Sequence, residues 1–312
     1  MYNVRIRVVI VNYNTKEALI ECLGSVLNSE LSGIDLQIHV IDNNSQDDSM
    51  IKAEKLFENN GQLTFIRNSD NLGFAKACNV GANNFSGDLL LFLNPDCFVE
   101  SDVIQETSRY ILQKENESLG VLGIKLLDED GQATTSHASF PTNWNLFYSS
   151  LGLDKNLPSY FKPVLQKSLS NEITVVDQIM GSFYLIKADV FKRVGSFDER
   201  FFVYYEEVDL SYRLRMLGYN NVYFPKVFAT HLGGHSSEQF RVNRLYYSLK
   251  SRWKYWCKHM KTIDLIIYFF IFFIEFFSRI FHVIVKCNFR KTLEILCSYI
   301  VLLKNSLYAR QK

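Results

Sequence analysis

The sequence is 312 residues long, with 47% hydrophobic and 21% charged residues, which excludes a disordered chain and allows one large domain or two smaller ones. Residues 1–240 carry 20 Lys and Arg against 30 Asp and Glu, whereas residues 241–312 carry 14 against 3. We therefore predict an acidic folded domain over 1–240 and a basic, aromatic-rich helical tail over 241–312. The basic residues of the tail alternate with long apolar runs, which favours an anionic membrane surface as its partner and argues against nucleic acid.

The cysteines and the N-terminus indicate a cellular compartment. The six cysteines show no CxxC spacing, which is typical of reduced thiols in the cytosol. The N-terminal stretch MYNVRIRVVIVNYN has an apolar run that is too short for a signal peptide and ends in polar turn residues. We therefore expect the protein to stay in the cytosol.

Apolar runs and helical spacings alternate along the N-terminal part of the chain. The predicted elements are a strand over 7–13, a helix over 15–29, a strand and loop over 36–45, a helix over 46–60, a strand over 63–68, a helix over about 74–85 and a strand entering a loop over 88–96. This alternation predicts an α/β, Rossmann-like fold with a mixed, mostly parallel sheet. Residues 128–175 are less regular and are predicted to form an insertion, after which 175–191 return to a strand and a helix.

Three of the predicted strands end in polar residues: NYN at 12–14, DNNS at 42–45 and NPD at 94–96. If the strands are parallel, all three ends lie at one edge of the sheet, which is where open α/β sheets bind ligands. Tyr13 can stack on a base there, and Asp42 can accept a hydrogen bond from the imide N–H of uracil or thymine. The alternative is that each is an ordinary turn. The coincidence of three such ends favours a nucleotide site.

The segment NLGFAKACNVGA, residues 71–82, places Gly73 and Asn79 in a loop that leads into a helix. The N–H groups at the start of that helix can face a diphosphate. The segment has neither the GxxxxGK[ST] nor the GxGxxG pattern, so by itself it is equally consistent with a flexible turn before a helix.

An acidic cluster lies within VGSFDERFFVYYEEVDLSYRLRMLGY, residues 194–219. Glu206, Glu207 and Asp209 open a predicted helix, where acidic residues are common because they interact favourably with the helix dipole. The helix dipole does not explain why aromatic residues precede these acids. The aromatic residues are Phe197, Phe201, Phe202, Tyr204 and Tyr205. A carboxylate desolvated by aromatic rings has a raised pKa and is a candidate general base.

His231 follows another apolar stretch and precedes Gly233 and Gly234, which allow a loop to fold over a ligand. A single histidine usually has a structural role. If it lies at the same edge of the sheet as Asp96, the two can hold Mg²⁺ or Mn²⁺, with diphosphate oxygens and water as the other ligands.

Together these motifs resemble those of the family 2 glycosyltransferases with the GT-A fold, in particular their bacterial rhamnosyltransferase-like branch. The likeness extends over residues 6–237, about three-quarters of the chain. It is carried by VVIVNYN, IDNNSQDDS, NLGFAKACNVGA, NPD, GSFDERFFVYYEEVDLSYRLRMLGY and HLGGHSS.

The resemblance implies a role for individual residues. The implied nucleotide-binding residues are Asn12, Tyr13, Asp42, Asn44, Asn71, Gly73, Asn79, Asn94 and Asp96. Asp96 and His231 would be the metal ligands, and Glu207 the general base, with Glu206 as a rival and Asp209 as the third acid of the catalytic group. Asn94 stands at the first acid position of the family's DxD motif, which resembles the branch that uses dTDP-rhamnose.

The resemblance implies an inverting, metal-dependent hexosyltransferase that acts in cell-surface polysaccharide synthesis, such as O-antigen synthesis. Its donor would be a dTDP- or UDP-linked sugar, with dTDP-rhamnose as the first candidate, and its acceptor a hydroxyl of a saccharide. One alternative is a catalytically silent sugar-nucleotide-binding or scaffold subunit of a polysaccharide assembly complex, which the intact acidic residues disfavour. Another is a nicotinamide oxidoreductase, which the missing GxGxxG disfavours.

The tail contains LIIYFFIFFIEFFSRIFHVIV, residues 265–285, which is long enough to span a membrane but carries charges in its middle. Glu275 and Arg279 are spaced to pair with each other. We expect an interfacial helix between the basic stretches 252–261 and 286–291, on the cytoplasmic face of the cell membrane as a peripheral protein, with a lipid-linked acceptor. The alternative is a helix packed against the rest of the chain or against a partner in a homo-oligomer.

Overall fold

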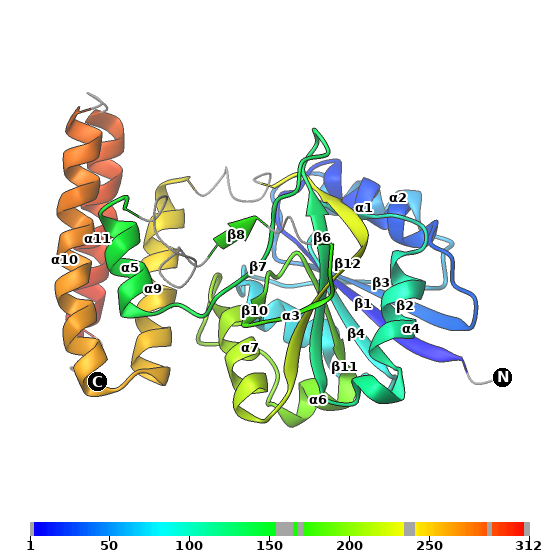
Figure 1. Cartoon of the computed structure of the whole chain (residues 1–312). Helices are drawn as coiled ribbons and strands as arrows, with labels where there is room; N and C mark the ends of the chain where they lie inside the picture. Colours follow the sequence, from blue (N-terminus) through cyan, green and yellow to red (C-terminus); the bar gives the residue numbers. More distant parts are fainter. Residues whose placement is uncertain (1–2, 154–164, 168–170, 234–240, 286–288, 309–312) are drawn as a thin grey trace. The chain divides into compact units, whose positions relative to one another are not determined.

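The computed structural model describes residues 3–153, 165–167, 171–233, 241–285 and 289–308 (Figure 1). The chain forms two compact units. Unit 1 comprises Met1–Ala138, Lys167–Phe202 and Glu206–Ser236, and unit 2 comprises Ser139–Gln166, Val203–Tyr205 and Ser237–Lys312. Unit 2 therefore takes two segments from the region in which the sequence predicts a single domain.

The first half of unit 1 alternates between strands and helices. Its elements are β1 (Val4–Asn12), α1 (Ala18–Leu27), β2 (Ile34–Asp42), α2 (Ser49–Leu56), β3 (Leu63–Arg67), α3 (Phe74–Ala82) and β4 (Leu89–Leu93). β1 pairs in parallel with β2 and with β4, and β2 pairs in parallel with β3. In this register Asn12 lies beside Asp42, and Ile10 beside Leu93. The three polar strand ends therefore lie at one edge of the sheet, as predicted.

The second half of unit 1 completes a mixed sheet. It contains β5 (Cys97–Val99), α4 (Val103–Ile111), η1 (Lys114–Asn116), β6 (Leu119–Leu127), β7 (Thr135–Ala138), β9 (Thr174–Val176), β10 (Gln178–Ile179), β11 (Phe183–Lys187), α6 (Ala188–Arg193), α7 (Glu206–Met216) and β12 (Asn220–His231). The strand order is β3-β2-β1-β4-β11-β6-β12-β5, with β9 paired to β12. β11, β5 and β9 run against the other strands, so the predicted mixed, mostly parallel sheet is confirmed.

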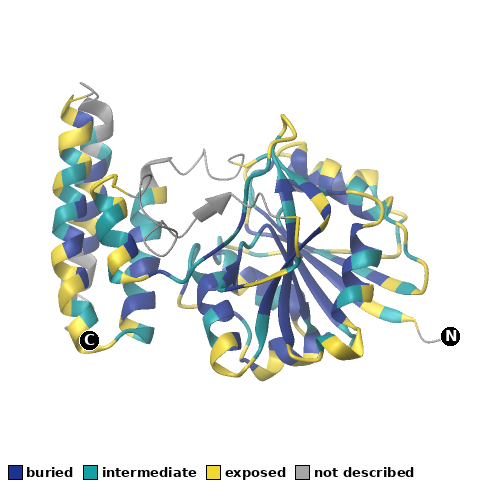
Figure 2. Cartoon of the chain, in the orientation of Figure 1, coloured by how far each residue is buried: buried dark blue, intermediate teal, exposed yellow. Residues whose placement is uncertain are grey.

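Both faces of this sheet are covered by helices, which explains why its central strands are continuously apolar. Along β1, Ile6 and Val8 lie in one hydrophobic cluster with side chains of α1, α2 and α4. Val9 and Val11 lie in a second cluster with side chains of α3, α6 and α7. The strands between these helices are buried (Figure 2). The burial is most complete toward the carboxyl ends of β1 and β2, whereas Gln37 and His39 in the interior of β2 are only half-buried.

Unit 2 is built mainly from helices. They are α5 (Asn143–Ser150), α9 (Arg241–His259), α10 (Thr262–Val285) and α11 (Phe289–Tyr308), and β8 (Leu165–Lys167) lies where the chain passes back to unit 1. Aromatic rings form much of its interior: the ring centroids of Trp256 and Tyr268 are 5.0 Å apart, and those of Phe272 and Tyr299 are 4.8 Å apart. Among the described residues, no helix combines the length and the apolar character needed to cross a bilayer.

The charged residues of α10 point into unit 2. Glu275 is 5% exposed, and its Oε1 accepts hydrogen bonds from Arg279 Nε and Nη2 at 3.0 and 2.7 Å, so the predicted pair is confirmed. By contrast, Phe277 and Phe281 are 65% and 71% exposed. The inward side of α10 is therefore mixed: it buries Glu275 together with Tyr268, Ile271, Phe272 and Val283, while other apolar side chains face outward.

Candidate active site

Asn12 and Asp42 form a buried pair at the carboxyl edge of the sheet. Asn12 Nδ2 donates to Asp42 Oδ1 at 2.8 Å, and also to Ser49 Oγ at 2.9 Å. Asp42 Oδ2 accepts from the backbone N–H of Ser45 at 3.1 Å. The aspartate therefore closes its own loop, as the turn interpretation requires, and at the same time fixes the end of β2 to the end of β1.

Two further predicted residues lie in these loops. Tyr13 directly follows β1 and is half-buried. Asn44 is exposed and has a φ of 62°, in the left-handed region that asparagine tolerates better than most residues. Both stand on the edge that Asn12 and Asp42 define, and their contact with a nucleotide stays a prediction.

The loop before α3 is tied to the end of β2. Asn43 Nδ2 donates to the carbonyl of Gly73 at 3.2 Å, and the N–H of Gly73 donates to Asn71 Oδ1 at 2.9 Å. The N–H of Phe74 donates to the carbonyl of Phe202 at 2.6 Å. The start of α3 is thus held between the loop after β2 and the segment that precedes α7.

Gly73 occupies a position that only glycine fits. Its φ is 82° and its ψ is 171°, a conformation that is essentially restricted to glycine. A Cβ atom there would also lie 2.3 Å from the carbonyl oxygen of Phe202. The glycine is therefore required by the close approach of two backbones.

We expect Gly73→Ala to lower the free energy of unfolding by roughly 2–4 kcal/mol, which combines backbone strain with the clash against Phe202. Gly33→Ala is the matched control, because Gly33 has a φ of 73° but an added methyl group would meet no heavy atom within 4 Å. It should lose only about 1–2 kcal/mol. Urea denaturation of both variants measures the difference. Equal losses would show that the approach of Phe202 imposes no constraint.

Asn79 contacts a different loop. Its Nδ2 donates to the carbonyl of Phe197 at 2.9 Å, and its Oδ1 accepts from the N–H of Phe197 at 3.1 Å. Nδ2 also donates to Glu199 Oε1 at 3.1 Å. The amide of Asn79 therefore holds the loop that leads toward α7, and its predicted place beside a nucleotide stays a prediction.

Asp96 and His231 lie together, as the sequence predicted they would if they shared an edge of the sheet. His231 Nε2 is 3.3 Å from Asp96 Oδ1 and 3.3 Å from Ser182 Oγ. Asn94 Nδ2 donates to Ser182 Oγ at 3.4 Å. The backbone also joins these segments, because the carbonyl of Asp96 accepts from the N–H of Leu232 at 3.1 Å. Three separate parts of the chain therefore meet at Asp96.

Asp96 and His231 offer one carboxylate and one imidazole to a divalent cation. The described residues contain no group of three or more His, Cys, Asp or Glu side chains suited to a metal. Small cations that act on phosphates are commonly held by one or two protein ligands, with phosphate oxygens and water in the other positions. Asp96 and His231 therefore suit a cation that also binds diphosphate oxygens. They are too few to complete the coordination of a cation that the protein holds alone. Gly234 and the rest of the loop after Gly233 lie outside the described residues.

Glu206 and Glu207 form a desolvated pair of carboxyl groups at the start of α7. One oxygen of each, Oε2, is buried without a hydrogen-bond partner among the described residues. Burial raises the pKa of Glu207 to about 7. Burial, and then the charge of Glu207, raise the pKa of Glu206 well above its usual value. Near neutral pH, Glu207 is therefore partly ionised, and Glu206 holds its proton more strongly than an ordinary glutamate.

The backbone before this pair is unusual. Tyr204 and Tyr205 have φ values of 65° and 69°, in the left-handed region that bulky residues rarely adopt. Backbone strain of this kind persists only where the surrounding structure imposes it, and it is concentrated at functional sites. It directs the chain into the first turn of α7, where Glu206 and Glu207 lie.

Asp209 has a different environment from the two glutamates. It is fully buried, and its Oδ2 accepts from Arg213 Nε at 2.8 Å. Arg213 in turn donates to the carbonyls of Val194 and Ser196 at 2.6 and 2.7 Å. This network ties α7 to the preceding loop. Asp209 is thus engaged in an ion pair with Arg213, and its place in the catalytic group stays a prediction.

β11 connects the two acidic groups. Ser182, beside Asp96 and His231, immediately precedes β11, and Tyr184 within that strand donates or accepts a hydrogen bond with Ser211 Oγ of α7 at 3.2 Å. Burial raises the pKa of Tyr184, and the charges of Glu207 and Asp209 raise it further. β11 therefore contacts α7 through Tyr184 and pairs with β4, the strand that leads to Asp96.

Comparison with known proteins identifies the family. The sequence pattern described as Glycosyl transferase family 2 matches residues 7–174, which is more than half of the chain. The chain belongs to glycosyl transferase family 2. The predicted membership, with its rhamnosyltransferase-like character, is confirmed by curated relatives of the same kind.

Three of these family 2 relatives are informative. The chain is 29% identical over 171 residues to rhamnosyltransferase WbbL of Escherichia coli K12, covering 54% of this chain and 61% of that one. It is 26% identical over 212 residues to the low-salt glycan biosynthesis hexosyltransferase Agl10 of Haloferax volcanii, covering 67% and 61%. It is 32% identical over 119 residues to the N-acetylglucosaminyl-diphospho-decaprenol L-rhamnosyltransferase of Mycobacterium tuberculosis, covering 38% and 39%. The matches thus span about three-fifths of the first two relatives.

Solved structures confirm the GT-A fold for this glycosyltransferase. GalNAc-T7 with UDP, GalNAc and Mn²⁺ aligns with a TM-score of 0.56 at 18% identity, covering 78% of this chain and 50% of that one. The mannosyltransferase PcManGT of Pyrobaculum calidifontis, with GDP-Man and Mn²⁺, aligns with a TM-score of 0.56 at 12% identity, covering 100% and 80%. At these identities the likeness establishes the fold alone.

The structure adds Ser182 to the site residues that the sequence predicted for this glycosyltransferase. Its hydroxyl lies between His231 and Asn94, although it is 88 residues away from Asn94 in the chain. The only sequence signal is its position directly before an apolar strand, in MGSFYLIK. That signal is too common to single out one serine.

Proposed function

We propose that this family 2 glycosyltransferase is an inverting enzyme that moves a sugar from a nucleotide-diphosphate donor to a hydroxyl of a saccharide acceptor. Rhamnose from dTDP-rhamnose is the proposed donor sugar, and a UDP-linked sugar is the alternative. Two relatives named as rhamnosyltransferases and the Asn94-Pro95-Asp96 sequence support this choice. The proposed setting is the synthesis of a cell-surface polysaccharide such as O-antigen.

The observation that carries the proposal is the buried carboxyl pair at the start of α7. Neither Oε2 atom has a hydrogen-bond partner within the described residues, and burial raises the pKa of Glu207 to about 7. A carboxylate with this pKa is ionised often enough, and is basic enough, to take a proton from a hydroxyl near neutral pH. A protein that only binds sugar nucleotides has no need to keep two glutamates desolvated, because desolvation is unfavourable for folding.

We assign the nucleotide to the loops after β1, β2 and the start of α3. Asp42, held by Asn12 and Ser45, has a fixed orientation in which it can accept a hydrogen bond from the imide N–H of uracil or thymine. Tyr13, beside them, supplies an aromatic ring for stacking. The N–H of Phe74 is taken by the carbonyl of Phe202, so the N–H groups that follow it at the start of α3 are proposed to face the diphosphate.

In the proposed reaction, Glu207 accepts the proton of the acceptor hydroxyl as its oxygen attacks the anomeric carbon from the side opposite the diphosphate. A single displacement of this kind inverts the anomeric configuration and needs no covalent intermediate. Asp96 and His231 would hold Mg²⁺ or Mn²⁺, which when bound neutralises charge on the leaving diphosphate. Ser182 orients His231 through the contact of its Oγ with Nε2. Asn94 in turn holds Ser182 by donating to that Oγ.

The rate should depend on pH in a direction set by Glu207. The base acts only when it is deprotonated, so with its pKa raised to about 7, kcat should fall about tenfold for each unit of pH below that value and level off above it. Initial rates of nucleotide-diphosphate release between about pH 5 and pH 9 measure this dependence. A rate that stays constant down to pH 5 would contradict a desolvated base.

Screening sugar nucleotides for turnover tests the reaction itself. Purified full-length protein is incubated with dTDP-rhamnose and a series of UDP-sugars, with acceptor lipid extract and Mg²⁺ or Mn²⁺, and nucleotide diphosphate release is measured. We expect release from one donor well above the background hydrolysis rate. Tight nucleotide binding by calorimetry without turnover of any donor would instead support the scaffold alternative.

We also propose that the protein is peripheral on the cytoplasmic face of the cell membrane and that its acceptor is lipid-linked. The basic composition of residues 241–312 and the exposed apolar side of α10 support this. The basic stretch at 286–291 lies outside the residues whose side chains are described. Fractionation of cells into salt-washed membranes and cytosol tests the placement, and a wholly soluble pool would contradict it.

A further inference from the structure

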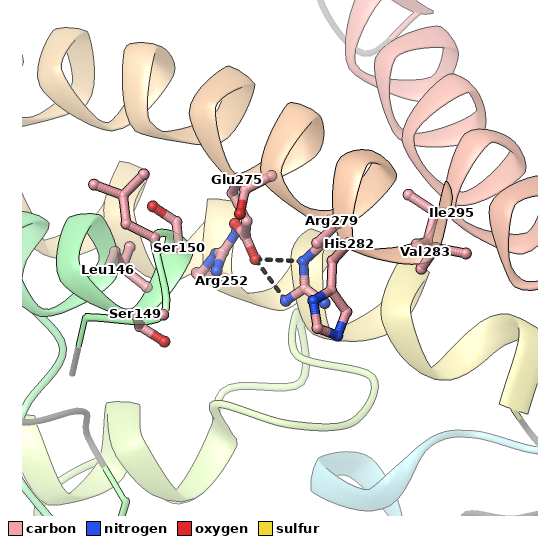
Figure 3. Close-up of a pocket in the computed structure, with 12 residues that line it drawn as sticks. Leu146, Ser149, Ser150, Arg252, Glu275, Arg279, His282, Val283 and Ile295 are labelled. Atoms are coloured by element: carbon pink, nitrogen blue, oxygen red, sulfur yellow. Dashed lines mark hydrogen bonds and ion pairs between the residues drawn. The ribbon is translucent and has the colours of Figure 1, made fainter. Parts of the chain in front are cut away.

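Unit 2 contains a cavity of about 430 Å³ that the transferase reaction does not use. Helices α5, α9, α10 and α11 all contribute to its lining (Figure 3). Its charged side chains are Arg252 from α9 and Glu275 and Arg279 from α10, and His282 adds an imidazole. Such a concentration of charge inside a helical unit is costly unless it serves a purpose, because each charge loses its hydration.

The charges in this cavity do not balance. Glu275 is the one carboxylate, and both of its oxygens are already engaged: Oε1 by Arg279 at 2.7 Å, and Oε2 by Arg252 Nη2. Arg252 Nε additionally donates to the hydroxyl of Tyr268 at 3.1 Å. The two guanidinium groups therefore carry one positive charge more than the carboxylate neutralises. Among the described residues, the Nη1 atoms of both arginines have no acceptor.

Arg252, Arg279 and His282 line the same cavity. Arg252 is buried, whereas Arg279 and His282 are exposed at the opening of the cavity. Ser149 of α5 and Ser278 of α10 add hydroxyl groups to the lining. Guanidinium forks and hydroxyls together suit an anion with several oxygens, and a phosphate group matches both the geometry and the charge excess.

The surface next to the opening indicates where that phosphate comes from. Val285, three residues after His282 on α10, is 65% exposed, and it continues into an exposed apolar side of the helix that includes Phe281 and Ile284, which are 71% and 58% exposed. An exposed apolar surface beside a cationic cavity fits a molecule that carries a phosphate on an apolar chain. The excess of basic residues over 241–312 adds attraction to an anionic bilayer surface.

We propose that the cavity of unit 2 binds the phosphate of an anionic phospholipid head group, with the exposed apolar side of α10 against the lipid chains. The phosphate supplies a second negative charge, so that the two arginines, Arg252 and Arg279, are balanced by Glu275 and the phosphate together. In this arrangement α10 lies along the bilayer surface, because its charged side faces the cavity and its apolar side faces outward. The inference rests on the proposed placement at the membrane and is independent of the proposed transfer reaction.

Vesicle binding by the full chain tests this inference. Co-sedimentation is measured with vesicles of phosphatidylcholine alone and with vesicles that also contain phosphatidic acid. We expect preference for phosphatidic acid, and Arg279→Gln to weaken that binding about tenfold or more, because it removes a charged hydrogen-bond donor from the cavity. Arg244→Gln is the matched control: it removes the same charge from an exposed position on α9 and should cost about fivefold or less.

Further measurements separate the possible outcomes. Circular dichroism melting of each variant shows whether it is folded, and donor hydrolysis by Arg279→Gln shows whether the transferase site is intact, so a failure of this inference differs from a failure of the proposed function. Calorimetry with inorganic phosphate tests the free anion. Equal vesicle binding by wild type and folded Arg279→Gln, or binding of inorganic phosphate without a preference for phosphatidic acid vesicles, would overturn the proposal.

Discussion

Replacing Glu207 by glutamine is expected to reduce turnover by about 10²–10⁴-fold, while the affinity for the nucleotide stays near that of the wild type. The amide has almost the same shape as the carboxylate but cannot accept the proton of a hydroxyl. Glu207 Oε2 has no hydrogen-bond partner among the described residues, so the change breaks no contact there. The effect should therefore appear in kcat, measured by nucleotide-diphosphate release, and not in calorimetric binding of the nucleotide.

Glu206→Gln is the matched control for this variant. Burial raises the pKa of Glu206 well above its usual value, which favours its protonated form, and a glutamine resembles that form. The substitution should therefore change kcat by only a few-fold. The two variants differ by one position in the same helical turn, which makes them equally disturbing to α7.

The opposite result would reassign the roles of the pair. If Glu207→Gln kept full activity while Glu206→Gln lost it, Glu206 would be the base and Glu207 the group that raises its pKa. If neither variant, nor the wild type, released nucleotide diphosphate from any donor, the catalytically silent alternative would gain support. Thermal melting of all three proteins separates either result from unfolding.

The sequence predicted the edge of the sheet where the site lies because the cause is local. The last residues before the polar ends of β1 and β2, and the whole of β4, are buried and mostly apolar, so the polar residue that follows each apolar run marks the end of the strand. Asn12, Asp42 and Asn94 are such residues. Parallel pairing then brings them together without any long-range information.

The sequence did not predict Ser182 or the composition of unit 2, because these depend on contacts between distant segments. Ser182 reaches Asn94 only because β11 pairs with β4 in the antiparallel direction. Likewise, Asn143 of α5 donates to the carbonyl of Asp264 at 3.0 Å and accepts from Trp256 Nε1 at 2.9 Å, which joins residues 143–150 to helices more than a hundred positions later. No local spacing of residues encodes either contact.

The direction of α10 illustrates the same limit. Its spacing alone predicted the pair of Glu275 and Arg279, since residues four apart are neighbours on a helix. Which side of the helix faces inward depends on Arg252, a residue of α9 that pairs with Glu275 across the unit. Periodicity identifies the two sides of a helix but not the partner that covers one of them.

Asp96→Asn should lower turnover by about 10²–10³-fold, and added Mg²⁺ or Mn²⁺ should not restore it. The asparagine retains the size of the side chain but loses the charge on the one carboxylate that, with His231, is proposed to hold the cation. Loss of this charge removes stabilisation of the leaving diphosphate, so the effect falls on kcat. Rates measured over a series of metal concentrations, together with nucleotide calorimetry with and without metal, report both consequences.

Ser182→Ala provides the comparison that decides whether the metal explains the loss. Its hydroxyl contacts His231 Nε2 at 3.3 Å but carries no charge, so its removal loosens a ligand without deleting one. We expect the metal concentration needed for half-maximal rate to rise about 10–100-fold, with full kcat recovered at saturating metal. If Asp96→Asn were also rescued by excess metal, or if wild-type turnover were unchanged by a chelator, Asp96 would position the diphosphate by itself and the proposed cation site would be wrong.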